Sequence, residues 1–199
     1  MKKFKKIVIT GGPCAGKTTA LDVIRKTYEE KGYTVVIVPE TATELLYGGV
    51  AIDSMETRLF QKTLLELQLH KEECFLKAVN DMKHEKIVVF FDRGAIDGKG
   101  YMKDEEFIQN LNELGLSEME LFNRYDAVIC LETAAKAPGN LYQTENNFVR
   151  FESQEEAIFV DQRLHEVWHT HQNFMLIHAD TDFDKKIGNL LNTIESILN

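Results

Sequence analysis

The sequence contains few cysteines, and their arrangement does not suggest a structural role. Among its 199 residues are three cysteines, Cys14, Cys74 and Cys130, an odd number without a Cys-x-x-Cys pair or a paired framework. A chain of this size can bury ~70% of the surface of its unfolded form, so it needs no disulfide or structural metal to hold a core. We therefore expect free thiols in a reducing compartment.

Positive charge and long apolar runs are also scarce. The chain has 23 Lys and Arg against 32 Asp and Glu, a formal net charge of −9. Nucleic-acid polymers are bound through basic surfaces, so this balance argues against DNA or long RNA as a partner while leaving room for a local nucleotide pocket. No run approaches the ~20 apolar residues of a membrane helix, and the lysine-rich start precedes an apolar stretch too short for a signal peptide. We expect a cytoplasmic protein without a membrane partner.

Short apolar runs alternate with longer stretches of helical period, a pattern typical of an α/β domain with a parallel sheet. The runs are rich in β-branched or aromatic residues and lack clean alternation, as strands buried on both faces do. Predicted strands cover 6–10, 34–38, 87–91, 127–131 and 174–178, and predicted helices cover 17–31, 54–83, 104–114, 117–123, 153–170 and 183–198. We expect the longest helix to begin at an acidic cap in Asp53-Ser54-Met55-Glu56.

No internal repeat, low-complexity segment or linker divides the chain, so residues 1–199 are expected to form one domain. The least regular stretch is 133–151, which holds Pro138-Gly139-Asn140 and Asn146-Asn147. A loop of about 20 residues inside a compact domain is uncommon and tends to be functional. We therefore predict a lid over approximately 133–163.

The strongest motif is Gly11-Gly12-Pro13-Cys14-Ala15-Gly16-Lys17-Thr18, a complete Gly-x-x-x-x-Gly-Lys-Ser/Thr sequence between a predicted strand and a predicted helix. Its glycines let the backbone turn so that successive N–H groups point at phosphate oxygens, and the positive end of the helix adds to the attraction. Lys17 is expected to reach the β- and γ-phosphates, Thr18 to bind Mg2+ and Thr19 to help hold the α-phosphate. Together with Thr19, the motif therefore predicts a binding site for ATP or GTP and its Mg2+ ion.

An apolar strand that ends in a carboxylate is the usual second part of such a site. Ile87-Val88-Val89-Phe90-Phe91-Asp92 fits this description, and Asp92 is expected to hold Mg2+ directly or through water. Val128-Ile129-Cys130-Leu131-Glu132 is the competing candidate. Asp92 is favoured because Arg93 follows it at once, which places a carboxylate and a guanidinium at the end of a strand where open parallel sheets bind ligands.

Two absences favour phosphate transfer over plain hydrolysis. Asp92 is followed by Arg rather than by the Glu that mechanical ATPases use to polarise water, and the Asn-Lys-x-Asp element of guanine-specific switches does not occur in the sequence. Glu40 ends the second strand and suits the base that takes the proton of an attacking hydroxyl, with an N-cap of the next short helix as its alternative role. Arg150, with Arg163 further along, is expected to close over the phosphates.

Three further features have competing interpretations. Cys14 occupies a variable position of the motif, and a redox-active thiol is its alternative role. The histidines between 165 and 171 favour a polar helix end with Trp168 packed inward over a metal site. The 54–83 helix has more leucines than a single apolar stripe facing the core requires. Core packing explains most of them, and a homodimer face is the alternative.

These segments together resemble a family of small P-loop domains, described as AAA-like ATP/GTP-binding domains. The family includes the ribosylnicotinamide kinase domain of bacterial NAD regulators and the nucleotide-binding domain of the TRP-channel translocation-defect protein. The resemblance covers nearly the whole chain, and its most specific part is Asn146-Asn147-Phe148-Val149-Arg150-Phe151-Glu152, followed by Glu155-Glu156-Ala157 and Asp161. Glu40 and Asp92-Arg93 extend it more distantly to the deoxynucleoside and thymidylate kinases.

The resemblance implies a nucleoside- or nucleotide-kinase-like three-layer sandwich with a parallel five-stranded sheet in the order 2-3-1-4-5 and a helical lid. It also implies that the turn containing Asp182 contacts the nucleotide base. Ala179-Asp180 stand where Asn-Ser is usual in the family, which leaves open whether the site prefers adenine or guanine.

The function implied is a Mg2+-dependent kinase that moves the γ-phosphate of ATP or GTP to a hydroxyl of a nucleoside- or nucleotide-like small molecule. Its catalytic residues would be Lys17, Glu40, Asp92, Arg93 and Arg150. The alternative is a regulatory switch that binds ATP or GTP, hydrolyses it slowly and signals to a protein partner.

Overall fold

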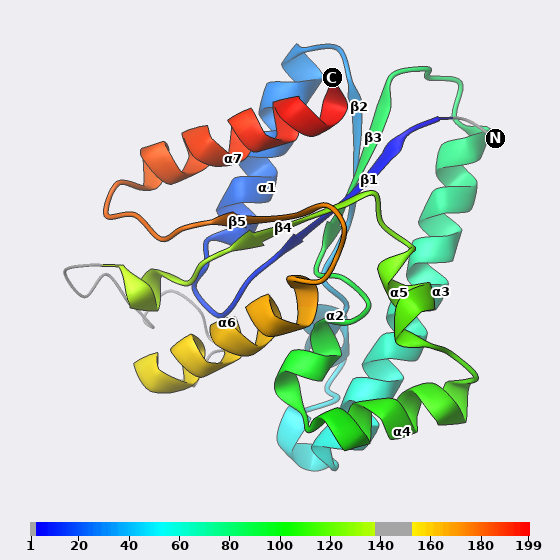
Figure 1. The fold of residues 1–199 in the computed structure, drawn as a ribbon. Helices are drawn as coiled ribbons and strands as arrows, with labels where there is room; N and C mark the ends of the chain where they lie inside the picture. The colour runs from blue at the N-terminus through cyan, green and yellow to red at the C-terminus, as the bar shows by residue number, and fades with distance from the viewer. Residues whose placement is uncertain (1–2, 138–152) are drawn as a thin grey trace.

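A computed structural model describes residues 3–137 and 153–199 of the chain. In this part of the protein, five parallel strands form one sheet with helices on both faces (Figure 1). The strands are β1 (Lys5–Thr10), β2 (Thr34–Val38), β3 (Ile87–Asp92), β4 (Ala127–Leu131) and β5 (Phe174–Ile177). They lie in the order β2-β3-β1-β4-β5, which confirms the predicted order and the predicted three-layer architecture.

Helices α1 and α7 cover one face of the sheet, and α3, α4, α5 and α6 lie on the other side (Figure 1). The helices are α1 (Lys17–Glu30), α2 (Thr41–Tyr47), α3 (Thr57–Asp81), α4 (Asp104–Leu114), α5 (Glu118–Phe122), α6 (Gln154–Trp168) and α7 (Phe183–Leu198). Short 3-10 turns occur at η1 (Ile52–Ser54), η2 (Asp97–Tyr101) and η3 (Ala134–Lys136). None of the helices described is both long and apolar enough to cross a bilayer.

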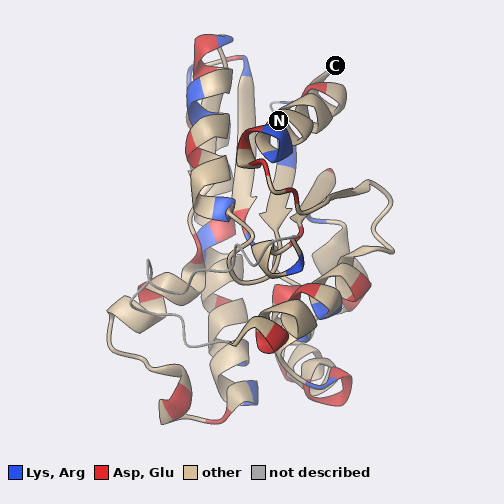
Figure 2. Cartoon of the chain, turned by 90° about the vertical axis from the view of Figure 1, so that its left-hand side faces the viewer, with Lys and Arg blue, Asp and Glu red and all other residues tan. Residues whose placement is uncertain are grey.

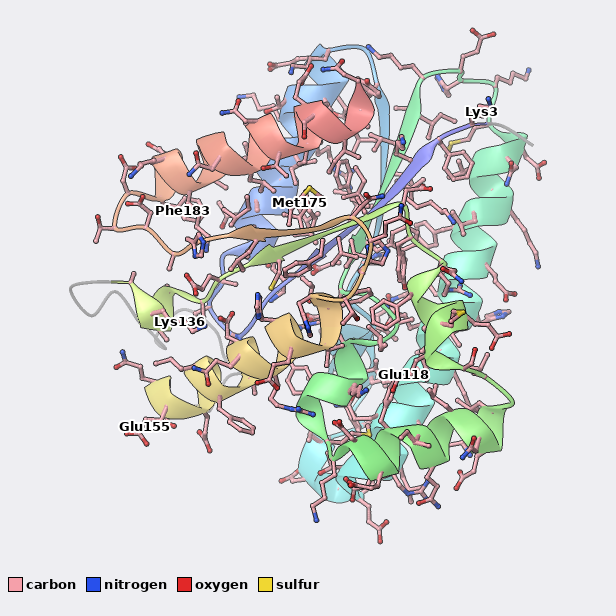
Figure 3. All side chains as sticks on the ribbon, in the orientation of Figure 1. Lys3, Glu118, Lys136, Glu155, Met175 and Phe183 are labelled. Carbon is pink, nitrogen blue, oxygen red and sulfur yellow. The ribbon has the colours of Figure 1, made fainter. Side chains whose placement is uncertain are left out.

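The sheet separates two apolar layers because successive strand residues point to opposite faces. Ile7 and Ile9 of β1 pack with α1 and α7, whereas Val8 between them packs on the side of α3 and α6. Side chains fill both spaces between sheet and helices (Figure 3). Charged residues lie mainly on the helices and connecting segments, and the strands are nearly free of them (Figure 2). Charged side chains that could take part in chemistry therefore lie at the ends of the strands rather than along them.

The predicted start of the longest helix is wrong. Residues 52–54 form the separate turn η1, Met55 is extended with φ −153° and ψ 167°, and α3 begins only at Thr57. Ser54 Oγ donates a hydrogen bond to the carbonyl of Ala51 (2.5 Å), a local bond that competes with helix formation. Among the leucines of α3, Leu65 is buried in the core, while Leu59 is 37% exposed. The homodimer face stays a prediction.

Gly94 follows β3 at a point where the chain passes against the buried ring of Trp168. A Cβ on Gly94 would lie 2.8 Å from Cη2 of Trp168 and nearer still to Cζ2. We expect Gly94→Ala to lower the free energy of unfolding, measured in urea, by ~1–3 kcal/mol because the ring cannot move aside. Gly188→Ala is the matched control, since a Cβ there meets no atom within 4 Å. It should leave stability unchanged or raise it by up to ~1 kcal/mol, and equal effects of the two substitutions would contradict this packing.

Candidate active site

The carboxyl ends of neighbouring strands bring four of the predicted site residues together. In the parallel pairing, Ile9 of β1 lies opposite Asp92 of β3, so the loop after β1 and the end of β3 are adjacent. Glu40 follows β2 at the same edge. The charges of Glu40 and Asp92 interact with each other and with Lys17, and Arg93 takes part in the same cluster.

The loop 11–16 has the tight backbone that the glycines of its motif predict. Gly11 and Gly16 have φ values of 140° and 83°, and a Cβ on Gly11 would overlap the carbonyl oxygen of Leu131. Cys14 also adopts a left-handed conformation, with φ 57°. This costs a non-glycine residue roughly 1–2 kcal/mol, so surrounding contacts must hold the loop in shape.

Asp161 of α6 supplies one such contact. It is 2% exposed, and its Oδ1 accepts hydrogen bonds from the backbone N–H groups of Gly12 (3.1 Å) and Thr133 (2.9 Å). A Cβ on Gly12 would lie 2.8 Å from the Cβ of Asp161, which explains why glycine is needed there. The Thr133 hydroxyl donates to the carbonyl of Pro13 (2.5 Å). The loop is thus joined directly to α6 and to the segment after β4.

Two buried lysines complete the frame of the loop. Lys186 of α7 is 5% exposed, and its Nζ donates to the carbonyls of Ala15 (2.9 Å) and Glu132 (2.6 Å). Lys17 is equally buried, and its Nζ lies 2.9 Å from the carbonyl of Gly11. Sequence reasoning gave Asp161 and Lys186 no role, because a charged residue on a helix carries no sign of its partner until the fold is known. For Asp161 the family resemblance was the only signal.

Asp92 fits the role of a cation ligand. Its Oδ1 is buried and has no hydrogen-bond partner among the described residues. Burial raises the pKa of Asp92; the ammonium of Lys17 opposes this rise without cancelling it, and Glu40 adds to it. A dehydrated carboxylate oxygen beside a phosphate loop suits Mg2+, which prefers oxygen ligands. Asp92 and the exposed Thr18, which lies in the first turn of α1, are the residues that can hold this ion.

Glu132, the competing carboxylate, is engaged in structural contacts. Its Oε2 accepts a hydrogen bond from the N–H of Ala179 (2.9 Å), and its Oε1 lies 3.3 Å from Nζ of Lys136. Lys136 also forms an ion pair with Asp161 (2.8 Å). These contacts join the end of β4 to the segments on either side of it, which makes Glu132 the weaker candidate for binding a metal ion.

Glu40 occupies the N-cap position of α2 but accepts no capping hydrogen bond from the helix backbone, and its carboxylate contacts the side chains of Arg93 and Thr43 instead. Arg93 Nε donates to Glu40 Oε1 (2.5 Å), and the Thr43 hydroxyl donates to Oε2 (2.7 Å). Burial alone would raise the pKa of Glu40, but the positive charges of Arg93 and Lys17 outweigh it and lower the pKa to about 2. Glu40 is therefore ionised at neutral pH, and its side chain stays partly exposed to solvent.

Arg93 is held in a strained backbone conformation. Its φ is 76°, and its N–H donates to the carbonyl of Ile9 (3.1 Å). Its guanidinium lies 3.5 Å from Asp97 Oδ2 and over the ring of Tyr101, 5.6 Å from the ring centre. Asp97 is 4% exposed and also accepts hydrogen bonds from the Thr10 hydroxyl and from Trp168 Nε1, both at 2.6 Å. A non-glycine residue in this conformation is common at functional sites.

The remaining predicted residues lie elsewhere or outside the described part of the chain. Arg150 falls outside the described residues. Arg163 on α6 pairs with Asp104 (2.5 Å) and Glu166 (3.1 Å) rather than facing the phosphate loop. Asp182 is the N-cap of α7, and its Oδ1 accepts hydrogen bonds from the next turn of backbone. Its neighbour Phe183 lies against Gly16 of the loop.

Lys136 and Phe183 mark the same end of the sheet in Figure 3. Thr19 is exposed beside Thr18. The side chain of Cys14 is partly exposed, and its carbonyl accepts a hydrogen bond from the N–H of Ala134 (3.2 Å). The redox role of Cys14 and the contact between the turn containing Asp182 and the nucleotide base stay predictions.

The prediction that Trp168 packs inward at the end of the histidine-containing helix is confirmed. Trp168 is fully buried, and the rings of His165 and His169 stack with centres 6.2 Å apart. Residues 3–137 and 153–199 contain no cluster of three or more metal-binding side chains of the His, Cys, Asp and Glu types.

Comparison with solved structures agrees with this architecture. The chain aligns over 99% of its length with 94% of a thymidylate kinase from Candida albicans, at 15% identity and a TM-score of 0.62. It aligns over 96% of its length with 99% of a deoxyadenosine kinase from M. mycoides with bound dATP, at 18% identity and a TM-score of 0.54. These similarities confirm a P-loop fold of the nucleotide-kinase type.

Comparison by sequence gives the family. No curated protein matches the chain significantly. The model of a family described as an AAA domain matches residues 6–186, from the first strand to the buried lysine of α7. With the phosphate loop and the strand order in agreement with it, the chain belongs to this family of AAA domains.

Proposed function

We propose that this protein is a phosphotransferase that moves the γ-phosphate of ATP or GTP to a hydroxyl of a nucleoside- or nucleotide-like small molecule. One observation carries the proposal: the ionised Glu40 lies in contact with Arg93, at the edge where Lys17 and Asp92 also meet. The residue after Asp92 is Arg rather than the Glu that polarises water in mechanical ATPases, and the carboxylate here comes from the end of β2, where it can orient a bound hydroxyl. This arrangement supports a second substrate.

The phosphate loop would bind the triphosphate through its backbone N–H groups and the start of α1. Lys17, now directed at loop carbonyls, would place its charge on the β- and γ-phosphates. Thr18 and Asp92 would hold Mg2+, which neutralises charge on the phosphates when bound. Arg93 would hold the acceptor-side carboxylate in place.

In the transfer step, a bond forms between the acceptor hydroxyl oxygen and the γ-phosphorus, and the bond from the γ-phosphorus to the bridging oxygen breaks. A nucleoside diphosphate leaves. The hydroxyl proton passes to the carboxylate of Glu40 and then to solvent. A carboxylate with a pKa of about 2 is a weak base. Its main task would be to orient the hydroxyl, because the loose transition state of phosphoryl transfer demands little proton removal.

The rest of the acceptor would lie in a hollow beside this cluster. A cavity of about 900 Å3 opens between the start of α3, η2, α4 and α6, lined by Arg58, Tyr101, Phe159 and Arg163 among others. Tyr101 links it to the site, because its ring lies under the guanidinium of Arg93. The lining combines aromatic rings with charged side chains of both signs, including Glu56 and Glu106, and this mixture suits a flat, polar molecule such as a nucleoside.

A turnover screen tests the proposal. Purified protein would be incubated with ATP or GTP and Mg2+ against a panel of nucleosides, nucleoside monophosphates and nicotinamide riboside, and phosphorylated product would be measured by mass spectrometry. At least one acceptor should accelerate nucleotide consumption and gain a phosphate. A panel in which no acceptor changes the slow background rate would contradict transfer and favour a binding switch.

We expect Glu40→Gln to lower the transfer rate by at least ~100-fold, because the hydroxyl loses the carboxylate that orients it and takes its proton. The dissociation constant of the Mg2+-nucleotide, measured by calorimetry, should change by no more than about threefold, since the hydrogen bonds of Glu40 go to Arg93 and Thr43 rather than to the loop. Glu44→Gln, on the same helix but paired with Lys71 at the surface, is the control and should keep the full rate. Full turnover by Glu40→Gln would show that Glu40 is not the acceptor-side group.

We expect Asp92→Asn to stabilise the free protein while weakening its use of Mg2+. Replacing a buried carboxylate whose Oδ1 lacks a partner removes a charge that burial disfavours, so the thermal unfolding midpoint should rise. Transfer should fall ~100-fold or more, because a Mg2+ ligand is lost.

Asp126→Asn, at the opposite end of the sheet, serves as the control, and its transfer rate should be unchanged. An Asp92→Asn protein with the Mg2+ dependence of the wild type would contradict the assignment.

A further inference from the structure

A buried polar network lies behind the turn that carries Asp92 and Arg93, and nothing in the proposed chemistry uses it. Its centre is Glu72 on α3, which is 1% exposed. Tyr125 OH donates to Glu72 Oε1 (2.7 Å), Gln68 Nε2 lies 3.2 Å from the same oxygen, and Arg124 Nε donates to Oε2 (2.8 Å). A buried carboxylate with three donors is fully engaged and therefore fixed in position.

Two members of the network reach the main chain of the turn. Gln68 Nε2 donates to the carbonyl of Arg93 (3.2 Å). Tyr125 OH accepts a hydrogen bond from the N–H of Ala95 (2.7 Å). The carbonyl of Arg93 and the N–H of Ala95 are thus both held by side chains that are hydrogen-bonded to Glu72.

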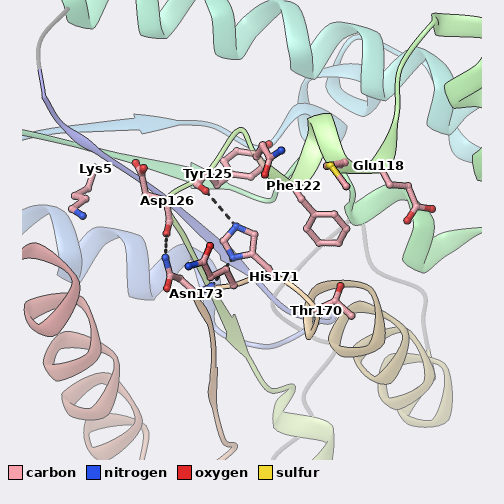
Figure 4. Close-up of a pocket in the computed structure, with 11 residues that line it drawn as sticks. Lys5, Glu118, Phe122, Tyr125, Asp126, Thr170, His171 and Asn173 are labelled. Carbon is pink, nitrogen blue, oxygen red and sulfur yellow. Dashed lines mark hydrogen bonds between the residues drawn. The ribbon is translucent and has the colours of Figure 1, made fainter.

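Tyr125 is itself held at several points. Its ring packs edge-on against Phe91 and Trp168, with ring centres 5.1 and 5.9 Å away. Its backbone carbonyl lies 3.3 Å from Nε2 of His171, the bond drawn across the hollow at the other end of the sheet in Figure 4. The hydroxyl of Tyr125 therefore has little freedom to follow a moving turn, and it can fix the position of Ala95.

We infer that Glu72, acting through Gln68 and Tyr125, is a positioning residue that holds the turn 92–95 so that Arg93 meets Glu40 and Asp92 faces the phosphate loop. This inference rests on the proposed function. A merely structural network would stabilise the fold without changing the reaction. A positioning network changes the rate of transfer more than the affinity for nucleotide, because misplacing reacting groups by about 1 Å costs up to ~100-fold in rate.

The test is Tyr125→Phe, which removes the hydroxyl and keeps the ring, compared with Tyr28→Phe. Tyr28 is also buried, and its hydroxyl bonds to the Leu191 carbonyl (3.2 Å) on the other side of the sheet. We expect Tyr125→Phe to lower kcat by ~10- to 100-fold with the nucleotide KM within about threefold of the wild type. Tyr28→Phe should cost stability and leave kcat unchanged. Equal kcat values in the two variants would overturn the inference.

A second variant and a readout independent of turnover complete the test. Gln68→Met removes the donor to the Arg93 carbonyl, and the double variant with Tyr125→Phe should lose less than the product of the two single effects, because both act on one turn. Amide hydrogen exchange at Arg93 and Ala95 should accelerate at least tenfold in Tyr125→Phe and not in Tyr28→Phe. Unchanged amide exchange in Tyr125→Phe would overturn the inference. A wild-type protein that transfers no phosphate to any acceptor would instead overturn the proposed function, and the exchange measurement would then still test whether the network holds the turn.

Discussion

The structure depends on a backbone loop that cannot hold its own shape. Residues 11–16 combine two left-handed glycines with a left-handed Cys14, and the strain is balanced by buried polar side chains from other elements. Asp161, Thr133 and Lys186 each bind a main-chain group of the loop. The loop that is proposed to bind phosphate is therefore also the point where β1, β4, α6 and α7 are joined.

A second constraint is electrostatic. Glu40 and Asp92 are both largely withdrawn from water near Lys17 and Arg93, yet their pKa values move in opposite directions. Two close cationic partners lower the pKa of Glu40, whereas burial dominates at Asp92. An ionised carboxylate at Glu40 and a costly buried carboxylate at Asp92 suit the two different tasks proposed for them, which are orienting an acceptor and binding a metal ion. The instability built into Asp92 is what binding of a cation would relieve.

Local sequence patterns were sufficient for most of the fold. The strands 34–38 and 127–131 and the helices 104–114 and 183–198 have the predicted bounds because clear turn or cap residues flank them. The predicted start of α3 was wrong because Asp53 and Ser54, which were expected to cap the helix, form part of a separate 3-10 turn. The phosphate loop followed from its motif, and the position of Glu40 and Asp92 at one edge of the sheet followed from the strand order. Asp161, Lys186 and Glu72 could not be assigned a role, since their importance comes from burial against distant segments.

All of the proposed chemistry requires that the loop at the end of β1 binds a purine nucleoside triphosphate with its divalent cation. Titration calorimetry of ATP and of GTP into the protein in magnesium buffer tests it most directly. We predict saturable binding of at least one of the two, weakened when magnesium is chelated and lost in Lys17→Ala. Absence of any heat of binding for both nucleotides, with the protein shown to be folded in the same buffer, would contradict the account.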